Sequence, residues 1–179
     1  MKRCLITDRS RLPPGLPLAE FAASRHPDLV QLREKDLEAR DLAALTQSLA
    51  ARGLRVVVNT RVDVALACQA AGAHLPSNSP PPSLWRALAP PGFLFGVSCH
   101  SLEDAVRAEQ EGASYVLLAP VFDPLSKAPS GPALGLEGLA AVCRAVRIPV
   151  WALGGITEDN APACIAAGAA GVAGITLFL

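Results

Sequence analysis

Polar side chains follow two of the chain's apolar runs, at the point where each run ends. Gln31, Arg33 and Lys35 lie two residues apart after one run, and Asn59 and Arg61 repeat that spacing after the next. In an extended segment, residues two apart project from the same side. Cationic and amide groups would therefore face one space, and such groups bind carboxylates and phosphates.

Two histidines belong to later apolar runs of the same kind. His74 lies within one run, and Ser98 and His100 follow another. The ordinary pKa of histidine suits proton transfer near neutral pH, so His74 and His100 are the candidate acid or base. The alternatives are that His74 points into the wall of the fold and that His100 supports the helix that begins after Ser101.

A pair of glycines, Gly154 and Gly155, follows the run IPVWAL, and a helix is predicted to begin at residue 157 or 158. Glycines let backbone N–H groups approach a ligand closely, and the free N–H groups at a helix start favour an anion. Gly171, Gly174 and Thr176 would form the opposite wall. The pattern predicts a phosphate site.

The stretch YVLLAPVFDPLSKAPSGPALG, residues 115–135, ends an apolar run in a proline-rich loop. We expect Lys127 to reach across and neutralise the same phosphate, with Ser126 donating a hydrogen bond to it. The prolines reduce the entropy lost when such a loop is ordered.

The elements that must position these residues alternate along the chain. Three segments, QAAGAHL, QEGASYV and AAGAAGV, each end a helical stretch at a glycine and lead into an apolar run. Extending this pattern predicts strands at residues 4–7, 29–33, 55–59, 73–75, 93–98, 115–119, 149–153 and 171–175. Helices are predicted at residues 18–25, 39–52, 62–71, 82–88, 102–111, 136–146 and 158–167. Strands that are apolar throughout indicate a parallel sheet covered by helices.

This alternation predicts a single domain over residues 1–179, folded as a small (β/α)8 TIM barrel that lacks the final C-terminal helix. An open doubly wound sheet is the alternative, but no GxGxxG motif follows the first strand. In a barrel the polar residues above gather at the C-terminal ends of the strands, which form the active-site face. Without an eighth helix, Leu177, Phe178 and Leu179 would be exposed, which predicts a symmetric homodimer that covers them.

Composition excludes several classes of protein. The formal net charge is zero, with 51% hydrophobic and 18% charged residues, and no Lys/Arg run suggests a nucleic-acid partner. No apolar run reaches the length of a membrane helix, and the N-terminus does not resemble a signal peptide. Five scattered cysteines indicate buried thiols of a cytoplasmic protein.

Several motifs resemble those of one superfamily. VQLREKD, VNTRVDVALA, GVSCHSLEDAVRAEQEGASYVLLAPVF and IPVWALGGIT are similar to the motifs of thiamine phosphate synthase and TenI-type thiazole tautomerase. The likeness runs from Leu5 to Thr176. It implies a (β/α)8 barrel of thiamine biosynthesis that holds a thiazole phosphate.

The two branches of that superfamily differ in their metal ligands. The synthase couples a pyrimidine pyrophosphate to the thiazole phosphate with Mg²⁺, and its pattern has acidic residues where this chain has Thr60 and Ser79. Neutral hydroxyls are poor ligands for Mg²⁺. The chain also has Pro124 where the synthase loop has threonine. The stretch LPSNS, residues 75–79, resembles the TenI branch, which needs no metal. The TenI base, however, is a histidine where this chain has Pro120, as the synthases do.

Three hypotheses follow from this mixture. The first is a metal-independent thiazole phosphate carboxylate tautomerase without a cofactor, in which Arg33 and Lys35 hold the carboxylate and Asn59 orients the ring. The second is thiamine phosphate synthase, favoured by Pro120, and by Gln31, Arg33, Lys35, Asn59, Ser98 and Lys127; Mg²⁺ is implied only here. The third is a non-catalytic protein that binds the thiazole phosphate.

Overall fold

The computed structural model describes residues 1–123 and 132–179. Its strands are β1 (Lys2–Ile6), β2 (Leu29–Leu32), β3 (Val56–Asn59), β4 (Gly72–Leu75), β5 (Leu94–Cys99), β6 (Tyr115–Leu118), β7 (Val150–Ala152) and β8 (Gly171–Gly174). Its helices are η1 (Arg9–Arg11), α1 (Leu18–Ser24), α2 (Ala39–Ala50), α3 (Val62–Ala67), α4 (Pro82–Arg86), α5 (Leu102–Gln110), α6 (Gly135–Ala145), α7 (Ala161–Ala166) and η2 (Thr176–Phe178). Each strand pairs in parallel with the next, and β8 pairs with β1, so the sheet closes into a barrel.

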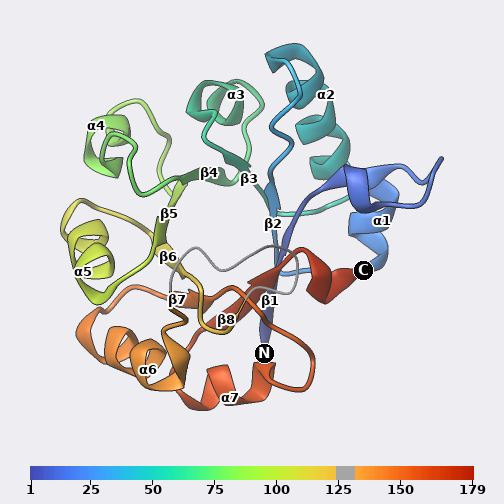
Figure 1. Ribbon diagram of the computed structural model, residues 1–179. Helices are drawn as coiled ribbons and strands as arrows, with labels where there is room; N and C mark the ends of the chain where they lie inside the picture. The colour runs from blue at the N-terminus through green and yellow to red at the C-terminus, as the bar shows by residue number, and fades with distance from the viewer. Residues whose placement is uncertain (124–131) are drawn as a thin grey trace.

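Two apolar layers hold this barrel together. One fills its interior with alternate residues of the strands, among them Cys4, Val57, Tyr115 and Trp151. The other lies between the strands and the surrounding helices, which Figure 1 shows as a ring around the barrel. Strands buried on both faces are apolar throughout. The predicted (β/α)8 barrel is therefore confirmed.

The helices end at the predicted glycines in two of three cases. Gly112 and Gly168 end their helices with φ of +91° and +105°, as predicted for glycine at a helix end. The prediction was wrong for Gly72, which is the first residue of β4. Gln69 takes the left-handed conformation there, with φ of +52°, and α3 ends at Ala67.

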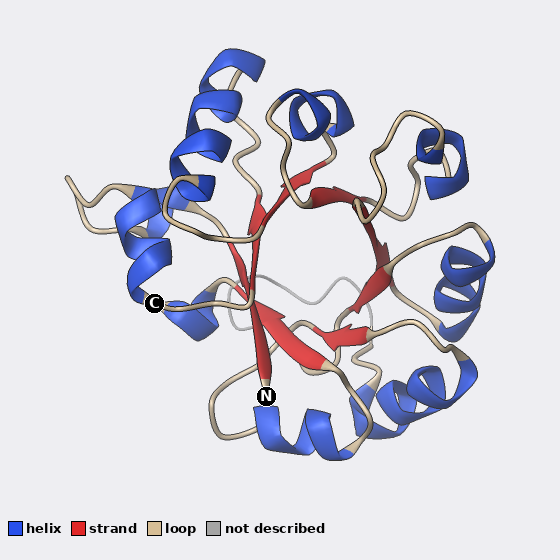
Figure 2. Ribbon diagram, turned by 180° about the vertical axis from the view of Figure 1, so that it is seen from behind, coloured by secondary structure: helices blue, strands red, loops and turns tan. Residues whose placement is uncertain are grey.

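The C-terminal segment supplies much of the cover that the sequence assigned to a second subunit. Leu177 is 9% exposed, Phe178 is 3% exposed, and both belong to the main core. The Arg3 guanidinium lies 4.7 Å from the centre of the Phe178 ring, and it donates a hydrogen bond of 2.7 Å to Glu158. Seen from behind in Figure 2, the C-terminus lies beside the helical wall.

The expected exposure of these terminal residues was thus wrong for Leu177 and Phe178 and right for Leu179, which is 53% exposed. The short helix η2 turns the two buried side chains into the chain's own core. The homodimer stays a prediction, to be tested by sedimentation equilibrium, and it no longer follows from a large uncovered patch. Across the described ranges, no helix combines the length and the apolar character that crossing a membrane requires.

Candidate functional site

The C-terminal ends of β2 and β3 bring Gln31 and Asn59 together. The Gln31 side-chain nitrogen Nε2 donates a hydrogen bond of 2.9 Å to Asn59 Oδ1. Gln31 is 3% exposed, and its Oε1 is buried without a hydrogen-bond partner among the described residues. A buried acceptor without a donor is costly, by about 1–3 kcal/mol. The pair therefore offers an unused acceptor at the barrel mouth.

Arg33 and Lys35 follow β2 and are the cations of this part of the mouth. Arg33 is half-buried and Lys35 exposed. The Arg33 N–H donates to Thr7 Oγ1 at 2.9 Å, which ties the end of β2 to the residue after β1. Neither side chain forms an ion pair with a carboxylate of the described residues. Binding of an anionic ligand by Arg33 and Lys35 stays a prediction.

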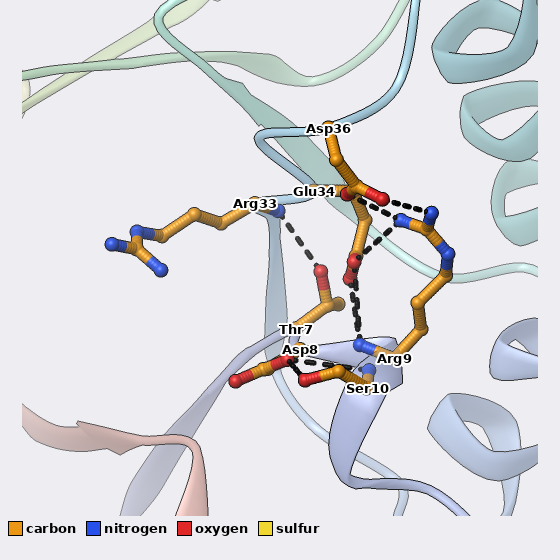
Figure 3. Close-up of polar contacts among 7 residues, drawn as sticks. All are labelled: Thr7, Asp8, Arg9, Ser10, Arg33, Glu34 and Asp36. Carbon is orange, nitrogen blue, oxygen red and sulfur yellow. Dashed lines mark hydrogen bonds and ion pairs between the residues drawn. The ribbon is translucent and has the colours of Figure 1, made fainter.

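Glu34, between these cations, and Asp36, after them, both contact Arg9. Arg9 donates to Glu34 Oε2 at 3.1 Å and also pairs with Asp36, and its backbone N–H donates to Glu34 Oε1 at 3.2 Å. Figure 3 shows the Arg33 side chain pointing away from this cluster. The hydrogen bond from Arg9 holds the pKa of the Asp36 carboxyl below its usual range. The cluster fixes the β2–α2 loop against the β1–α1 loop.

Two hollows flank the β2–α2 loop. The larger has a volume of about 740 Å³ and is lined partly by Asp8, Arg33 and Lys35. The smaller has a volume of about 300 Å³ and is lined partly by Lys35, Asn59 and Thr60. Ligand sites commonly occupy clefts of these sizes. Lys35 borders both hollows.

Arg61 differs from the other predicted cations because a neighbour engages it. Its guanidinium donates to both carboxylate oxygens of Asp63, at 2.9 and 2.6 Å. This pair raises the pKa of Arg61 and lowers that of Asp63. A ligand would have to compete with Asp63 for Arg61. The residue lines the smaller hollow, but its charge is already balanced.

Thr60, between Asn59 and Arg61, has a strained backbone. Its φ is +61°, and the Arg61 N–H donates to the Asn59 carbonyl at 2.8 Å across it, which makes a γ-turn. A β-branched residue with this φ is a true outlier, and strain of this kind occurs at functional sites.

His74 and Ser98 meet on the inside of the barrel. His74 Nε2 lies 2.9 Å from Ser98 Oγ, and His74 Nδ1 lies 3.3 Å from the Tyr115 hydroxyl. Burial lowers the pKa of His74 to about 3. His74 is 1% exposed, and its contact with Tyr115, which belongs to the interior layer, shows that the ring points into the interior of the barrel rather than into the surrounding wall. Ser98 is half-buried at the mouth.

His100 lies outside the interior and is exposed. Its Nδ1 is 2.8 Å from the Ala119 carbonyl, so this nitrogen carries a proton and donates. Its backbone N–H donates to Asp104 Oδ2 at 3.0 Å, in the turn that Ser101 caps by accepting from the Asp104 N–H. The expected support of the helix start is therefore present. Burial raises the pKa of the nearby Cys99 thiol to about 12, which removes its thiolate near neutral pH.

The predicted phosphate site lies only partly within the described residues. Gly154 and Gly155 have φ of +93° and +64°, and a Cβ on Gly155 would lie 2.4 Å from the Asp123 carbonyl oxygen. Their N–H groups donate to no residue of the described ranges. Gly174 ends β8, and Thr176 is exposed at the start of η2. Ser126 and Lys127 lie outside the described residues.

The prediction that a helix begins at residue 157 or 158 was wrong. Thr157 and Asn160 exchange two hydrogen bonds: the Thr157 N–H donates to Asn160 Oδ1 at 2.9 Å, and the Asn160 N–H donates to Thr157 Oγ1 at 3.2 Å. These contacts form a turn that leads into α7, because the Ala161 N–H donates to the Thr157 carbonyl at 3.0 Å, and α7 begins only at Ala161. The glycine pair is thus followed by a turn and not directly by a helix start.

Thr60 and Ser79 stand where the synthase pattern has its acidic metal ligands, and neither carries a carboxylate. Thr60 Oγ1 donates to the Asn59 carbonyl at 2.7 Å, and Ser79 Oγ donates to the Pro80 carbonyl at 3.1 Å. Mg²⁺ prefers anionic oxygen ligands. Within residues 1–123 and 132–179, no three His, Cys, Asp or Glu side chains come together as a metal group. The donor set at these positions does not fit Mg²⁺.

Sequence reasoning missed several residues that organise the mouth. Arg9 and Thr7 hold the β2–α2 loop, and Tyr115 and Gly96 shape the surroundings of His74. The pattern around β6 gave Tyr115 only as an apolar strand residue. A hydroxyl on the first residue of an apolar strand was the available signal, because a buried tyrosine needs a hydrogen-bond partner.

Comparison with known proteins agrees with this architecture. Residues 4–178 match the family described as thiamine monophosphate synthase (TMP-TENI). Thiamine-phosphate synthase of Methanoculleus marisnigri is 45% identical, over 89% of this chain and 77% of its own length. Thiamine-phosphate synthase of Roseiflexus sp. is 43% identical, over 98% of this chain and 77% of its own. The solved structure of thiamine phosphate pyrophosphorylase from Pyrococcus furiosus superposes with a TM-score of 0.83 at 32% identity, covering 97% of this chain and 84% of that one. The chain belongs to the thiamine monophosphate synthase and TenI family of thiamine biosynthesis.

Proposed function

We propose that the chain is an enzyme that binds a thiazole phosphate at the barrel mouth and couples it to a pyrimidine pyrophosphate, as thiamine-phosphate synthases do. The observation that carries this proposal is similarity over 89–98% of the chain to proteins of that name, together with Arg33 and Lys35, which form no ion pair with the described residues. The tautomerase, which the sequence motifs put first, has no such support from the named relatives.

Each group at the mouth has a distinct task in this proposal. Arg33 and Lys35 bind the pyrophosphate, whose negative charge grows as it leaves. The free Gln31 oxygen accepts a hydrogen bond from a ring substituent, and Asn59 holds the Gln31 amide in place. The N–H groups of Gly154 and Gly155 bind the thiazole phosphate, with Ser126 and Lys127 assigned to the same phosphate.

The poor fit of Thr60 and Ser79 to Mg²⁺ favours a second candidate. A metal-independent thiazole tautomerase needs an anion site and a proton-transfer group but no acidic ligands. Its substrate carries a carboxylate for Arg33 and Lys35 and a phosphate for the glycine pair. Among the candidates of the described ranges, His100 has an exposed ring whose Nε2 is left for proton transfer.

One experiment separates the proposals. The purified protein receives the pyrimidine pyrophosphate with thiazole phosphate, or the thiazole phosphate carboxylate tautomer alone, each with Mg²⁺ and with a chelator. Phosphorus and proton NMR then follow the products. Release of pyrophosphate together with thiamine phosphate supports the synthase, and aromatisation without metal supports the tautomerase.

A charge-removing variant shows whether turnover belongs to the barrel mouth. Arg33→Gln should abolish most of either activity, whereas Arg52→Gln, in the turn after the C-terminal end of α2, should not. Binding of the thiazole phosphate without turnover would support the third hypothesis, a non-catalytic binding protein. No binding and no turnover would overturn the proposed function.

A further inference from the structure

Three polar side chains from neighbouring strands form a continuous line inside the barrel. Tyr115 of β6 contacts His74 of β4 through its hydroxyl and Nδ1, at 3.3 Å, and His74 contacts Ser98 of β5 through Nε2 and Oγ, at 2.9 Å. Tyr115 and His74 are 4% and 1% exposed, while Ser98 is half-buried at the mouth. The line thus runs from the sealed interior to the place where a ligand enters.

A glycine on β5, the strand between β4 and β6, makes the contact between His74 and Tyr115 possible. Gly96 of β5 lies level with His74 on one side and Tyr115 on the other. A Cβ on Gly96 would lie 2.3 Å from the Tyr115 hydroxyl oxygen and 2.5 Å from His74 Nδ1. Any residue larger than glycine would therefore occupy the space in which the two side chains meet.

The direction of the hydrogen bonds follows from what each group can do. The Tyr115 hydroxyl carries one proton, and the acceptor within hydrogen-bond distance of it among the described residues is His74 Nδ1. Leaving a buried donor unpaired is costly, so the hydroxyl donates and Nδ1 accepts. The single proton of the neutral ring is then on Nε2, which donates to Ser98 Oγ. The Ser98 proton is left free to point into the mouth.

We propose that His74 is a positioning residue, held by Tyr115 in the Nε2–H tautomer, that fixes Ser98 as a hydrogen-bond donor to an anionic oxygen of the substrate. This inference rests on the proposed function in so far as the substrate is a phosphate ester. His74 itself stays neutral and transfers no proton. The burial that depresses its pKa agrees with this role.

The other tautomer of His74 would give Ser98 a different role. If Nδ1 carried the proton, Nε2 would accept from Ser98, and the serine oxygen would face the mouth as an acceptor or a nucleophile. The Tyr115 proton would then have no acceptor in the described interior. The tautomer of His74 therefore decides between the two arrangements, and it can be measured without any substrate.

The first measurement is nitrogen NMR on protein labelled at histidine, with Tyr115→Phe and Ser98→Ala as variants. His74→Gln, compared with the unmutated protein, assigns the His74 signals among those of the three histidines. We expect the Nε2–H tautomer from neutral pH down to at least pH 5, unchanged in Ser98→Ala and partly lost in Tyr115→Phe. An Nδ1–H tautomer, or protonation of His74 between pH 5 and 8, would overturn the proposal.

The second measurement is a double-mutant cycle on binding of thiazole phosphate and of inorganic pyrophosphate, by calorimetry. Ser98→Ala should weaken binding of one of these probes about 3- to 10-fold, the effect of one hydrogen bond. Tyr115→Phe should weaken the same probe when Ser98 is present and have no further effect in Ser98→Ala. Equal effects in both backgrounds would show that Tyr115 affects binding independently of Ser98 and would overturn the positioning role.

A matched control separates packing from positioning. Trp151 lies in the same layer, with its ring 6.5 Å from that of Tyr115, and no hydrogen bond joins it to the line. Trp151→Phe should lower thermal stability and leave the His74 tautomer and both affinities unchanged. If the unmutated protein binds neither probe, the proposed function fails, and the tautomer still decides whether His74 fixes Ser98.

Discussion

The Arg9 guanidinium donates to Glu34 Oε2 at 3.1 Å, and the Glu34 side chain is only 4% exposed. A carboxylate that is buried to this extent needs a charged partner and further donors. Arg9 supplies both, because its backbone N–H also donates to Glu34. With Glu34 anchored on this side, the Arg33 side chain points away from the cluster, as Figure 3 shows. Lys35 lies in the turn that follows Glu34.

Arg9→Ala should therefore affect stability and ligand binding together. Loss of charge-assisted hydrogen bonds to a buried carboxylate should lower the free energy of unfolding by about 1.5–3 kcal/mol, as measured by urea denaturation. Release of the β2–α2 loop should also weaken pyrophosphate binding. Arg11→Ala is the matched control, because Arg11 pairs with the partly exposed Asp8 three residues away. Its effect should stay below about 1 kcal/mol. Equal losses in the two variants would contradict the anchoring role of Arg9.

The barrel fold and the end of the barrel that carries the mouth could both be predicted from the sequence, because both depend on local periodicity. Apolar strands alternating with helices required a covered parallel sheet. The two-residue spacing of Arg33 and Lys35 predicted only that both would face one side if the strand continued, and the structure places Lys35 in a turn. Arg9 and Glu34 could not be paired in this way, since they are 25 positions apart and meet only after β1 and β2 align. The direction of the His74 ring likewise depended on the space above Gly96, which no local pattern shows.

The buried His74 predicts a specific loss of stability in mild acid. Its pKa is 6.5 in the unfolded chain and about 3 in the fold, so the unfolded state binds the extra proton between these values. Stability is therefore full above about pH 6.5 and falls as the pH is lowered, by up to about 1.4 kcal/mol per pH unit.

Urea denaturation of the unmutated protein and of His74→Gln between pH 7 and 4.5 measures this contribution. We expect His74→Gln to be less stable at pH 7 but to show a shallower decline. Carboxylates with lowered pKa values, such as Asp8 and Asp63, act mainly below this range. Parallel curves for the two proteins would show that His74 does not become protonated on unfolding.

Gly96→Ala should be poorly tolerated although alanine is the smallest possible addition. The new methyl group would lie 2.1 Å from Tyr115 Cζ, in an interior that has no room to yield. Overpacking of this kind should cost about 1–3 kcal/mol in thermal or urea unfolding. Tyr115→Leu in the Gly96→Ala background removes the obstructing ring. The double variant should recover part of the stability lost in Gly96→Ala. If the two effects on the free energy of unfolding were purely additive, the new methyl group would clash with a residue other than Tyr115.

Phe178→Ala tests whether the C-terminal segment is part of the core. Phe178 is 3% exposed and packs under Arg3, so its truncation should cost about 3–5 kcal/mol in unfolding free energy. Leu179→Ala is the control, because Leu179 is 53% exposed and should change stability by less than about 0.5 kcal/mol. Sedimentation equilibrium on both variants tests the homodimer at the same time. A large effect of Leu179→Ala on association would indicate that this end lies in a subunit interface.

Substitutions at Thr60 test whether this position can hold a carboxylate ligand for Mg²⁺. Its φ of +61° suits asparagine or aspartate far better than a β-branched residue. Thr60→Asp should therefore preserve or raise the melting temperature, whereas Thr60→Val, which keeps the branch and loses the hydroxyl, should lower it.

Aspartate at this position also restores one carboxylate of the synthase pattern, and Ser79→Asp restores the other. If these positions together form the metal site that the resemblance implies, the double variant should gain a Mg²⁺-dependent rise in melting temperature, because an ion that binds only the folded state stabilises it. The unmutated protein and Thr60→Asn with Ser79→Asn, which have the same shapes without charge, should show no such rise. An equal response to Mg²⁺ in all three proteins would mean that the ion binds elsewhere, and the neutral residues at 60 and 79 would then no longer favour the metal-independent reaction.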